Sequence, residues 1–140
     1  MQTRTILNRI QKHKGFVYGC ERWGPSDGPL SLVIPIRADK RCRPRCSGCD
    51  QPGPGYDRLP ERRFEFIPMW GIAIFFLYAL RRVDCKACGV RVEKVPWAQG
   101  SGTLCTRYQW FLSQWAKKLS GKQVAEVLCT SWESVYKSVQ

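Results

Sequence analysis

Two short stretches decide the fold of this chain: CSGC at residues 46–49 and CKAC at residues 85–88. Each is a C-x-x-C motif with a glycine inside the pair or directly after it. Two thiolates at this spacing on a tight turn can face one ion, and two such turns complete a tetrahedral Zn²⁺ site. We therefore expect one structural zinc ion per chain, with no coordination position open for water. Its four expected ligands are Cys46, Cys49, Cys85 and Cys88.

The chain has eight cysteines, which leaves a secreted disulfide framework as an alternative to the metal site. Residues 1–14 are polar and basic, without the apolar segment of a signal peptide. This start, the paired motifs and the net charge favour a metal site in a reducing, cytoplasmic compartment. A thioredoxin-like redox pair is disfavoured because neither motif opens an amphipathic helix.

Cys42 offers a second way to build the first half of the metal site. The spacing from Cys42 to Cys46 is also permitted for a zinc knuckle, but the spacing from Cys46 to Cys49 mirrors that of the second motif. The only histidine, His13, would reach the site only if residues 1–14 folded back. The other three cysteines are expected to be ordinary thiols: Cys20, Cys105 and Cys129.

Composition narrows the class of protein. The chain has 140 residues, a formal net charge of +12 and six tryptophans, and 44% of its residues are hydrophobic. This excludes a disordered basic tail and allows one ordinary domain or two small ones. A basic chain folded around a metal site favours nucleic acid as its partner. The longest apolar run, Ile72–Leu80, is too short for a membrane helix, which needs about 20 residues, and is expected to be a buried strand.

The chain is predicted to be α+β: a β-rich zinc ribbon followed by a small helical unit. Alternation and turn residues predict strands at 16–20, 30–36, 62–67 and 72–83, and the last two form a hairpin between the cysteine motifs. The expected divisions are a basic lead-in at 1–14, the ribbon at 15–95, a linker at 96–103 and a helix-turn-helix at 104–140.

The helical unit is predicted because the spacing of apolar residues changes from that of a strand to that of a helix. Apolar residues between Leu104 and Leu119 recur with helical spacing, and shorter helices are predicted at 122–128 and 132–139. Thr130 and Glu133 fit a capping box at the start of the last helix. Two short helices joined by a three-residue turn form the outline of a helix-turn-helix motif.

Four segments carry a family resemblance: RPRCSGC at 43–49, GYDRLPERR at 55–63, RRVDCKACG at 81–89 and VEKVPWA at 92–98. In this order they resemble the amino-terminal region of bacterial insertion-sequence transposases of the ISL-three group. The resemblance covers about residues 16–139. It implies a zinc-finger module with the same four cysteine ligands, then a helix-turn-helix, ahead of an RNase-H-like core that would lie beyond Gln140.

The resemblance implies a DNA-binding portion of a transposase that recognises double-stranded transposon ends. It also implies a bacterial, nucleoid-associated location, with self-association in a full-length protein. We expect no catalysis by this chain, because none of its eleven acidic residues can be assigned to an Asp-Asp-Glu core. The alternative is a zinc-ribbon adaptor that binds RNA or a protein partner and has no catalytic role.

Two groups of residues are candidates for contact with DNA. The first is a basic segment, expected to contact phosphates and extended by Arg62-Arg63 and Arg81-Arg82. The second is the polar face of the last helix, expected to reach a major groove. The aromatic residues Trp110, Trp115, Trp132 and Tyr136 could stack on bases, but three of the four fall on apolar helix faces, which favours packing in the core. The candidate contact residues are Arg37, Lys40, Arg41, Arg43 and Arg45 in the segment, and Ser131, Ser134, Lys137 and Ser138 in the helix.

Overall fold

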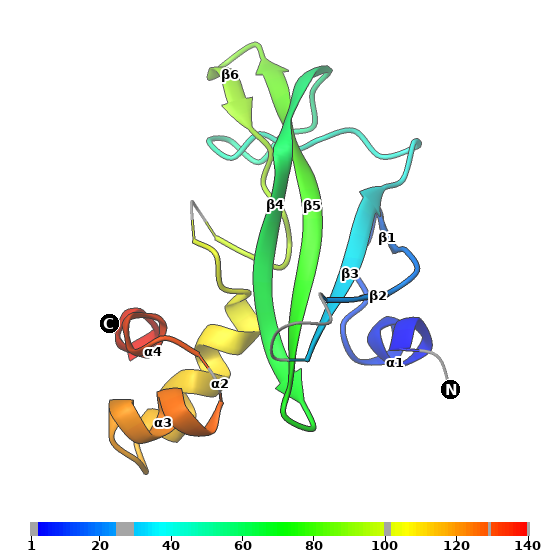
Figure 1. Ribbon diagram of the computed structural model, residues 1–140. Coiled ribbons are helices and arrows are strands. Elements are labelled where there is room, and N and C mark those ends of the chain that lie inside the picture. Colours follow the sequence, from blue (N-terminus) through cyan, green and yellow to red (C-terminus); the bar gives the residue numbers. More distant parts are fainter. Residues whose placement is uncertain (1–2, 25–29, 100–101, 129, 140) are drawn as a thin grey trace.

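The computed structural model describes residues 3–24, 30–99, 102–128 and 130–139, and Cys129 lies outside these ranges. The described part is α+β, as predicted, with six strands and four helices (Figure 1). The helices are α1 Thr3–Ile10, α2 Thr106–Ala116, α3 Gly121–Val127 and α4 Trp132–Val139. The strands are β1 Phe16–Tyr18, β2 Arg22–Trp23, β3 Ser31–Ala38, β4 Gly55–Met69, β5 Ile72–Cys85 and β6 Gly89–Val92.

A long antiparallel hairpin of β4 and β5 is the central element of the molecule (Figure 1). It closes with Met69 opposite Ile72, so its turn is Trp70-Gly71, and both turn residues have positive φ, of 49° and 73°. Two positive φ angles match the type I′ turn that suits the twist of a hairpin. β4 begins earlier than predicted and contains Pro60 and Pro68, which its place at the sheet edge permits.

The sheet has the order β1-β3-β5-β4, with β2 beside β3 and β6 beside β5. β3 runs parallel to β5, from Ser31 opposite Ala73 to Pro35 opposite Leu77. The sequence pattern did not predict this pairing. Along β5, alternate side chains from Ile74 to Leu80 are buried, and the residues between them are half-buried. The apolar run is therefore a strand with one buried face.

A single hydrophobic core joins the sheet to the helices. Its centre is Trp97, which is fully buried and makes edge contacts with Phe16, Phe64 and Tyr78. Trp97 belongs to the predicted linker 96–103, which is thus part of the core at this point. The predicted lead-in 1–14 contains helix α1, whose Leu7 is also fully buried.

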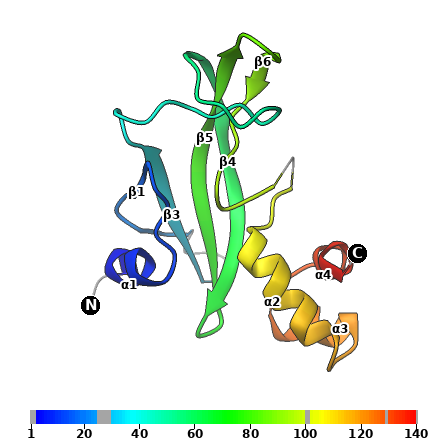
Figure 2. The same ribbon diagram turned by 180° about the vertical axis from the view of Figure 1, so that it is seen from behind.

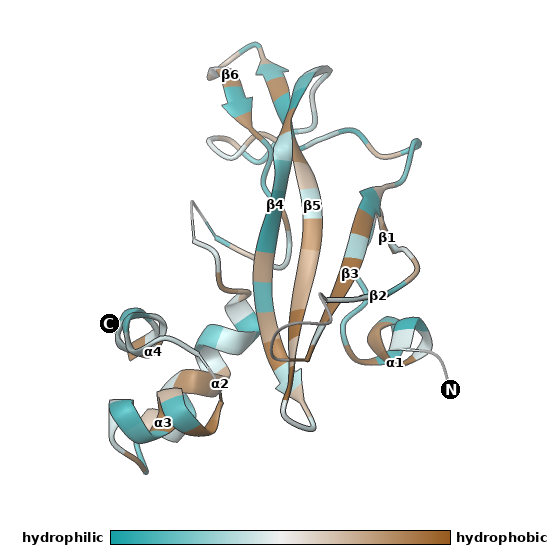
Figure 3. Cartoon of the chain, viewed as in Figure 1, coloured by the Kyte–Doolittle hydropathy of each residue, from teal (hydrophilic) through white to brown (hydrophobic). Residues whose placement is uncertain are grey.

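Helices α2, α3 and α4 gather beside β4, away from β6, whereas α1 lies on the other side of the hairpin, near β1 and β3 (Figures 1 and 2). The predicted capping box at Thr130 is wrong: the hydroxyl of Ser131 accepts the bond from the backbone N–H of Ser134. A full capping box occurs instead at α3, between Ser120 and Gln123. Hydrophobic residues dominate β3, β5 and the hairpin end, whereas the region of β6 is more hydrophilic (Figure 3). In the part of the chain described, no helix has the length and apolar character needed to cross a bilayer.

Candidate metal centre and its basic surroundings

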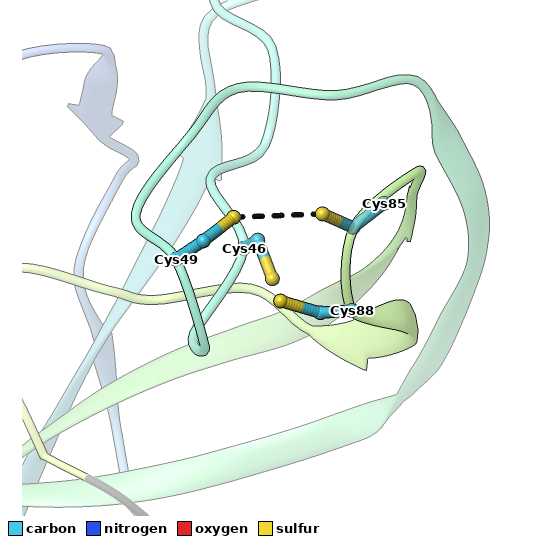
Figure 4. A group of neighbouring side chains, drawn as sticks. All are labelled: Cys46, Cys49, Cys85 and Cys88. Atoms are coloured by element: carbon cyan, nitrogen blue, oxygen red, sulfur yellow. Dashed lines mark hydrogen bonds between the residues drawn. The ribbon is translucent and has the colours of Figure 1, made fainter.

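Four cysteine sulfurs meet at the β6 end of the hairpin (Figure 4). The Sγ atoms of Cys46, Cys49, Cys85 and Cys88 all lie within 4.8 Å of one another, and those of Cys49 and Cys85 are 3.5 Å apart. A regular tetrahedron of sulfurs around Zn²⁺ has edges of about 3.8 Å, because each Zn–S bond is about 2.3 Å. The cluster is therefore compatible with a metal site built from the four predicted residues.

The two halves of the cluster have different local origins. Cys85 ends β5 opposite Gly89, so the second motif forms the turn between β5 and β6. Gly89 has a φ of +80°, which favours glycine at this turn. The first motif lies in a loop where the backbone N–H of Cys46 donates to Gln51 and its carbonyl accepts from Asp50. Antiparallel pairing of β4 with β5 then places both motifs at one end of the hairpin.

Gly48 leaves room for the sulfurs. A Cβ atom at position 48 would lie 3.0 Å from Sγ of Cys88 and 3.6 Å from Sγ of Cys46. The backbone N–H of Gly48 also donates to Sγ of Cys46 at 3.3 Å, as expected where a thiolate ligand is stabilised by backbone donors. The small residue inside the first motif is thus explained by crowding around the cluster.

The structure shows which of the two candidate cysteines, Cys42 or Cys46, joins the sulfur cluster. Cys46 belongs to the cluster and Cys42 does not. Sγ of Cys42 instead approaches Gly15, where a Cβ atom would be only 3.0 Å away. His13 packs against Trp97, with ring centroids 5.5 Å apart, and burial lowers its pKa. Cys105 is fully buried, as predicted, whereas Cys20 is exposed.

Proton affinity differs among the clustered thiols. Hydrogen bonds from the backbone of Cys49 and Gly48 lower the pKa of Cys46 to about 7. The hydrogen bond to Cys46, followed by that to Cys49, raises the pKa of Cys88 to about 12. Thiolates packed this closely repel one another, so one ionises easily and its neighbour keeps a proton. A divalent cation is the ligand that relieves this repulsion.

A buried ion pair connects the cluster to the core. The side chain of Glu93 is fully buried and lies 2.9 Å from Nη2 of Arg81. Glu93 also accepts hydrogen bonds from the hydroxyl of Tyr78 and the backbone N–H of Arg81, at 2.5 and 2.8 Å. Burial and the bond to Glu93 raise the pKa of Tyr78. Nη1 of Arg81 donates to the carbonyl of Cys42 at 3.0 Å, which ties the basic segment to the sheet. No pattern in the sequence predicted this network.

The predicted basic segment lies next to the cluster, and all five of its candidate cations are exposed. Arg45 directly precedes Cys46, and its guanidinium donates to the carbonyl of Asp50 at 3.1 Å. None of the three ion pairs found among the described residues includes any of the five. Their charges thus face solvent without a neutralising carboxylate.

The other basic pairs do not extend this surface. Arg62 and Arg63 lie opposite Tyr78 and Leu77, in the middle of the hairpin. Arg81 is bound to Glu93, and Arg82 forms an ion pair with Asp57. Arg81 does reach the segment 37–45 and lines one cavity with Arg43 and Arg45, but Glu93 offsets its charge. The four residues therefore do not form the single extended patch that was predicted.

The candidate residues of α4 differ in what they can offer a partner. Lys137 is exposed. The hydroxyl of Ser138 donates to the carbonyl of Val135 at 2.6 Å, and those of Ser131 and Ser134 bond to each other at 2.8 Å. Three of the four candidates thus already use their hydroxyls within the helix or its cap.

The prediction that four aromatic residues pack in the core is wrong. Trp110 is 64% exposed, Trp115 43%, Trp132 54% and Tyr136 51%. The helical unit is small: α2 buries Tyr108 and Leu112, while α3 and α4 each bury one valine. Trp132 and Tyr136 stack on each other on the outside of α4, with centroids 5.2 Å apart.

The two predicted contact groups lie apart. The basic segment is at the β6 end of the hairpin, and α4 lies to the side of β4, in both views (Figures 1 and 2). A single partner that touches both must therefore be extended. Comparison of the chain with protein-family models, curated proteins and solved structures gives no match.

Proposed function

We propose that the chain is the DNA-binding amino-terminal portion of a transposase, which recognises transposon terminal repeats and uses one Zn²⁺ ion as a structural staple. The observation that carries this proposal is the position of the basic segment. Its exposed cations continue directly into a cluster of four cysteine sulfurs within 4.8 Å of one another. A closed metal site would hold these cations at fixed positions, and fixed cations are suited to phosphate contacts.

In this proposal the helical unit supplies specificity. The short helices α3 and α4 fit the outline of a helix-turn-helix motif. Lys137 is the most available of the four predicted contact residues, because the serine hydroxyls are already bonded. The exposed rings of Trp132 and Tyr136 add an apolar surface that can contact thymine methyl groups. No catalytic step is assigned to this chain.

The test is selection of bound sequences from random duplex DNA, followed by binding isotherms at several salt concentrations. We expect an enriched sequence and a steep decrease of affinity with salt. Lys137→Ala should reduce the preference for the enriched sequence by about 1–3 kcal/mol. Lys118→Ala, an exposed lysine beyond the end of α2, is the control. Absence of enrichment would contradict sequence-specific recognition.

A second candidate function is an adaptor that binds a protein partner, and the exposed aromatic residues favour it. Tryptophan and tyrosine are enriched at protein interfaces. Trp110, Trp132 and Tyr136 are each more than half exposed on the helical unit. An apolar protein interface depends weakly on salt, so the same titration separates this candidate from DNA binding.

A further inference from the structure

A cavity of about 440 Å³ lies between the first cysteine motif and the start of β1. Its cationic lining comes from four separate segments of the chain: Lys14 before β1, Arg43 and Arg45 beside Cys46, Arg81 on β5, and Lys94 after β6. Neither Lys14 nor Lys94 was among the predicted contact residues. Cations that converge from distant segments on one concavity need an explanation, since like charges repel.

The acidic residues of the cavity leave a positive excess. Glu93 is fully engaged by Arg81 and Tyr78, so this pair contributes little net charge. Asp50 is the other lining carboxylate, and it lies 3.7 Å from Nζ of Lys94 with both side chains more than half exposed. An exposed pair at this distance is weak. Among the described residues, Lys14, Arg43 and Arg45 have no carboxylate within ion-pair distance.

Backbone contacts hold the walls in place without any ligand. The N–H of Lys94 donates to the carbonyl of Arg45 at 2.8 Å, and the N–H of Asp39 donates to the carbonyl of Gly15 at 2.8 Å. Gly15, the residue after Lys14, has a φ of +86° and lies too close to Cys42 for a side chain. The cavity is therefore preorganised, which lowers the entropic cost of binding.

A simpler explanation for these cations is the charge of the neighbouring cluster. Four thiolates around one Zn²⁺ carry a net charge of about −2, which nearby lysines and arginines would offset. This explanation predicts that removal of the lysines weakens metal binding. It does not explain why the cations line a concavity, in which a tetrahedral anion can be contacted from several sides and by guanidinium groups in pairs.

We propose that this cavity binds a backbone phosphate of duplex DNA, and that Lys14 and Lys94 are phosphate ligands there together with Arg43 and Arg45. The inference rests on the proposed function and adds to it a defined phosphate site and two contact residues. A duplex held here lies against the metal-bound loop, so the metal centre positions the contact while remaining outside it.

The test compares Lys14→Gln/Lys94→Gln with the control Lys117→Gln/Lys118→Gln in the zinc-loaded full chain. The control removes the same charge from exposed lysines beyond the end of α2. The probe is a labelled duplex of random sequence, and affinity is measured at several salt concentrations alongside metal content. We expect the cavity variant to flatten the slope of log K against log salt by roughly 1.8, or about 0.9 per lost contact. Its metal content should stay that of wild type, and the control should keep the wild-type slope.

The other outcomes separate the explanations. Equal slopes in the cavity variant and the control would overturn the phosphate site while leaving DNA binding intact. Loss of metal from the cavity variant would show that the lysines serve the thiolate cluster, and would also overturn it. Failure of the wild-type protein to bind any duplex would overturn the proposed function and this inference together.

Discussion

The two ends of the β4–β5 hairpin are stabilised by different interactions. Near the turn and along the middle, Phe64, Phe66, Ile74 and Phe76 are almost completely buried and form a continuous core with the helices. At the β6 end, all four residues of β6 are exposed and Cys46 is the one buried member of the sulfur cluster. One end is thus stabilised by apolar burial, and the other has little apolar surface to bury.

This difference shows what the cluster contributes. A short strand and two loops without a core of their own need a crosslink to hold one conformation. Metal binding would supply it, because the free energy of binding at such a site is also free energy of folding. The comparison therefore predicts that the two ends can be disrupted separately.

The largest expected effect is that of metal loss. Cys85→Ser should abolish zinc binding, and the apparent free energy lost is of the order of 10–16 kcal/mol at such sites. Metal analysis checks the occupancy, and hydrogen exchange should show lost protection at residues 39–54 and 85–95, with protection retained in β3 and the middle of β5. Cys42→Ser, outside the cluster, is the control and should keep its metal. Full occupancy in Cys85→Ser, or none in wild type, would refute the assignment.

The end of the hairpin that is stabilised by apolar burial is best tested at Trp97. Trp97→Ala should destabilise the protein by about 3–5 kcal/mol, because it leaves a large cavity against Phe64 and Tyr78. Denaturant unfolding of the metal-loaded protein measures the loss. Trp70→Ala removes a ring that is 89% exposed at the hairpin turn and should cost far less. Similar losses in the two variants would contradict the assigned core.

Glu93 lies where the two ends meet. Glu93→Gln keeps the shape of the side chain but removes its charge, leaving Arg81 without its partner in a buried setting. We expect a loss of about 1.5–3 kcal/mol, the range for hydrogen bonds to charged groups. Asp57→Asn, at the exposed pair with Arg82, serves as the control and should have little effect. Chemical denaturation measures the free energy of unfolding of both variants. An unchanged value for Glu93→Gln would mean that the two ends of the hairpin are uncoupled.

The smallest expected effect concerns the capping box of α3. Ser120→Ala removes the hydroxyl that accepts from Gln123 and should cost about 1 kcal/mol. Thr130→Ala tests the box that the sequence pattern predicted at α4, where the structure places the cap at Ser131 instead. Thermal unfolding should show the larger loss for Ser120→Ala. A larger loss for Thr130→Ala would support the capping box that was predicted at Thr130.

Local patterns predicted the parts of the fold that local interactions determine. The spacing within each cysteine motif correctly identified the four members of the cluster, including Cys46 instead of Cys42. Alternation and period also located the hairpin and the three helices after Leu104. In each case a few neighbouring residues contain the information, because the relevant contacts are close in sequence.

Features that depend on distant contacts were not predicted. Nothing in residues 31–38 specifies that β3 lies parallel to β5, since the partner strand is more than thirty residues away. Trp97 stands between Pro96 and two glycines, which indicate a linker, and only the assembled sheet shows that it fills the core. The exposed rings of α4 follow helical spacing as core residues do, so periodicity alone could not separate the two cases.

The parallel pairing of β3 with β5 has a consequence for the order of folding. The β4–β5 hairpin closes over a two-residue turn, whereas Ser31 must find Ala73 across the intervening loop and strand. Loop closure favours the local step, so the hairpin should form first and β3 should join later. Closure of the hairpin also brings both cysteine motifs to one end. We therefore expect metal capture to precede docking of β3. In folding kinetics, the ratio of the change in activation free energy to the change in stability (the kinetic φ-value) should be near one for mutations at the Trp70-Gly71 turn and near zero for mutations in β3.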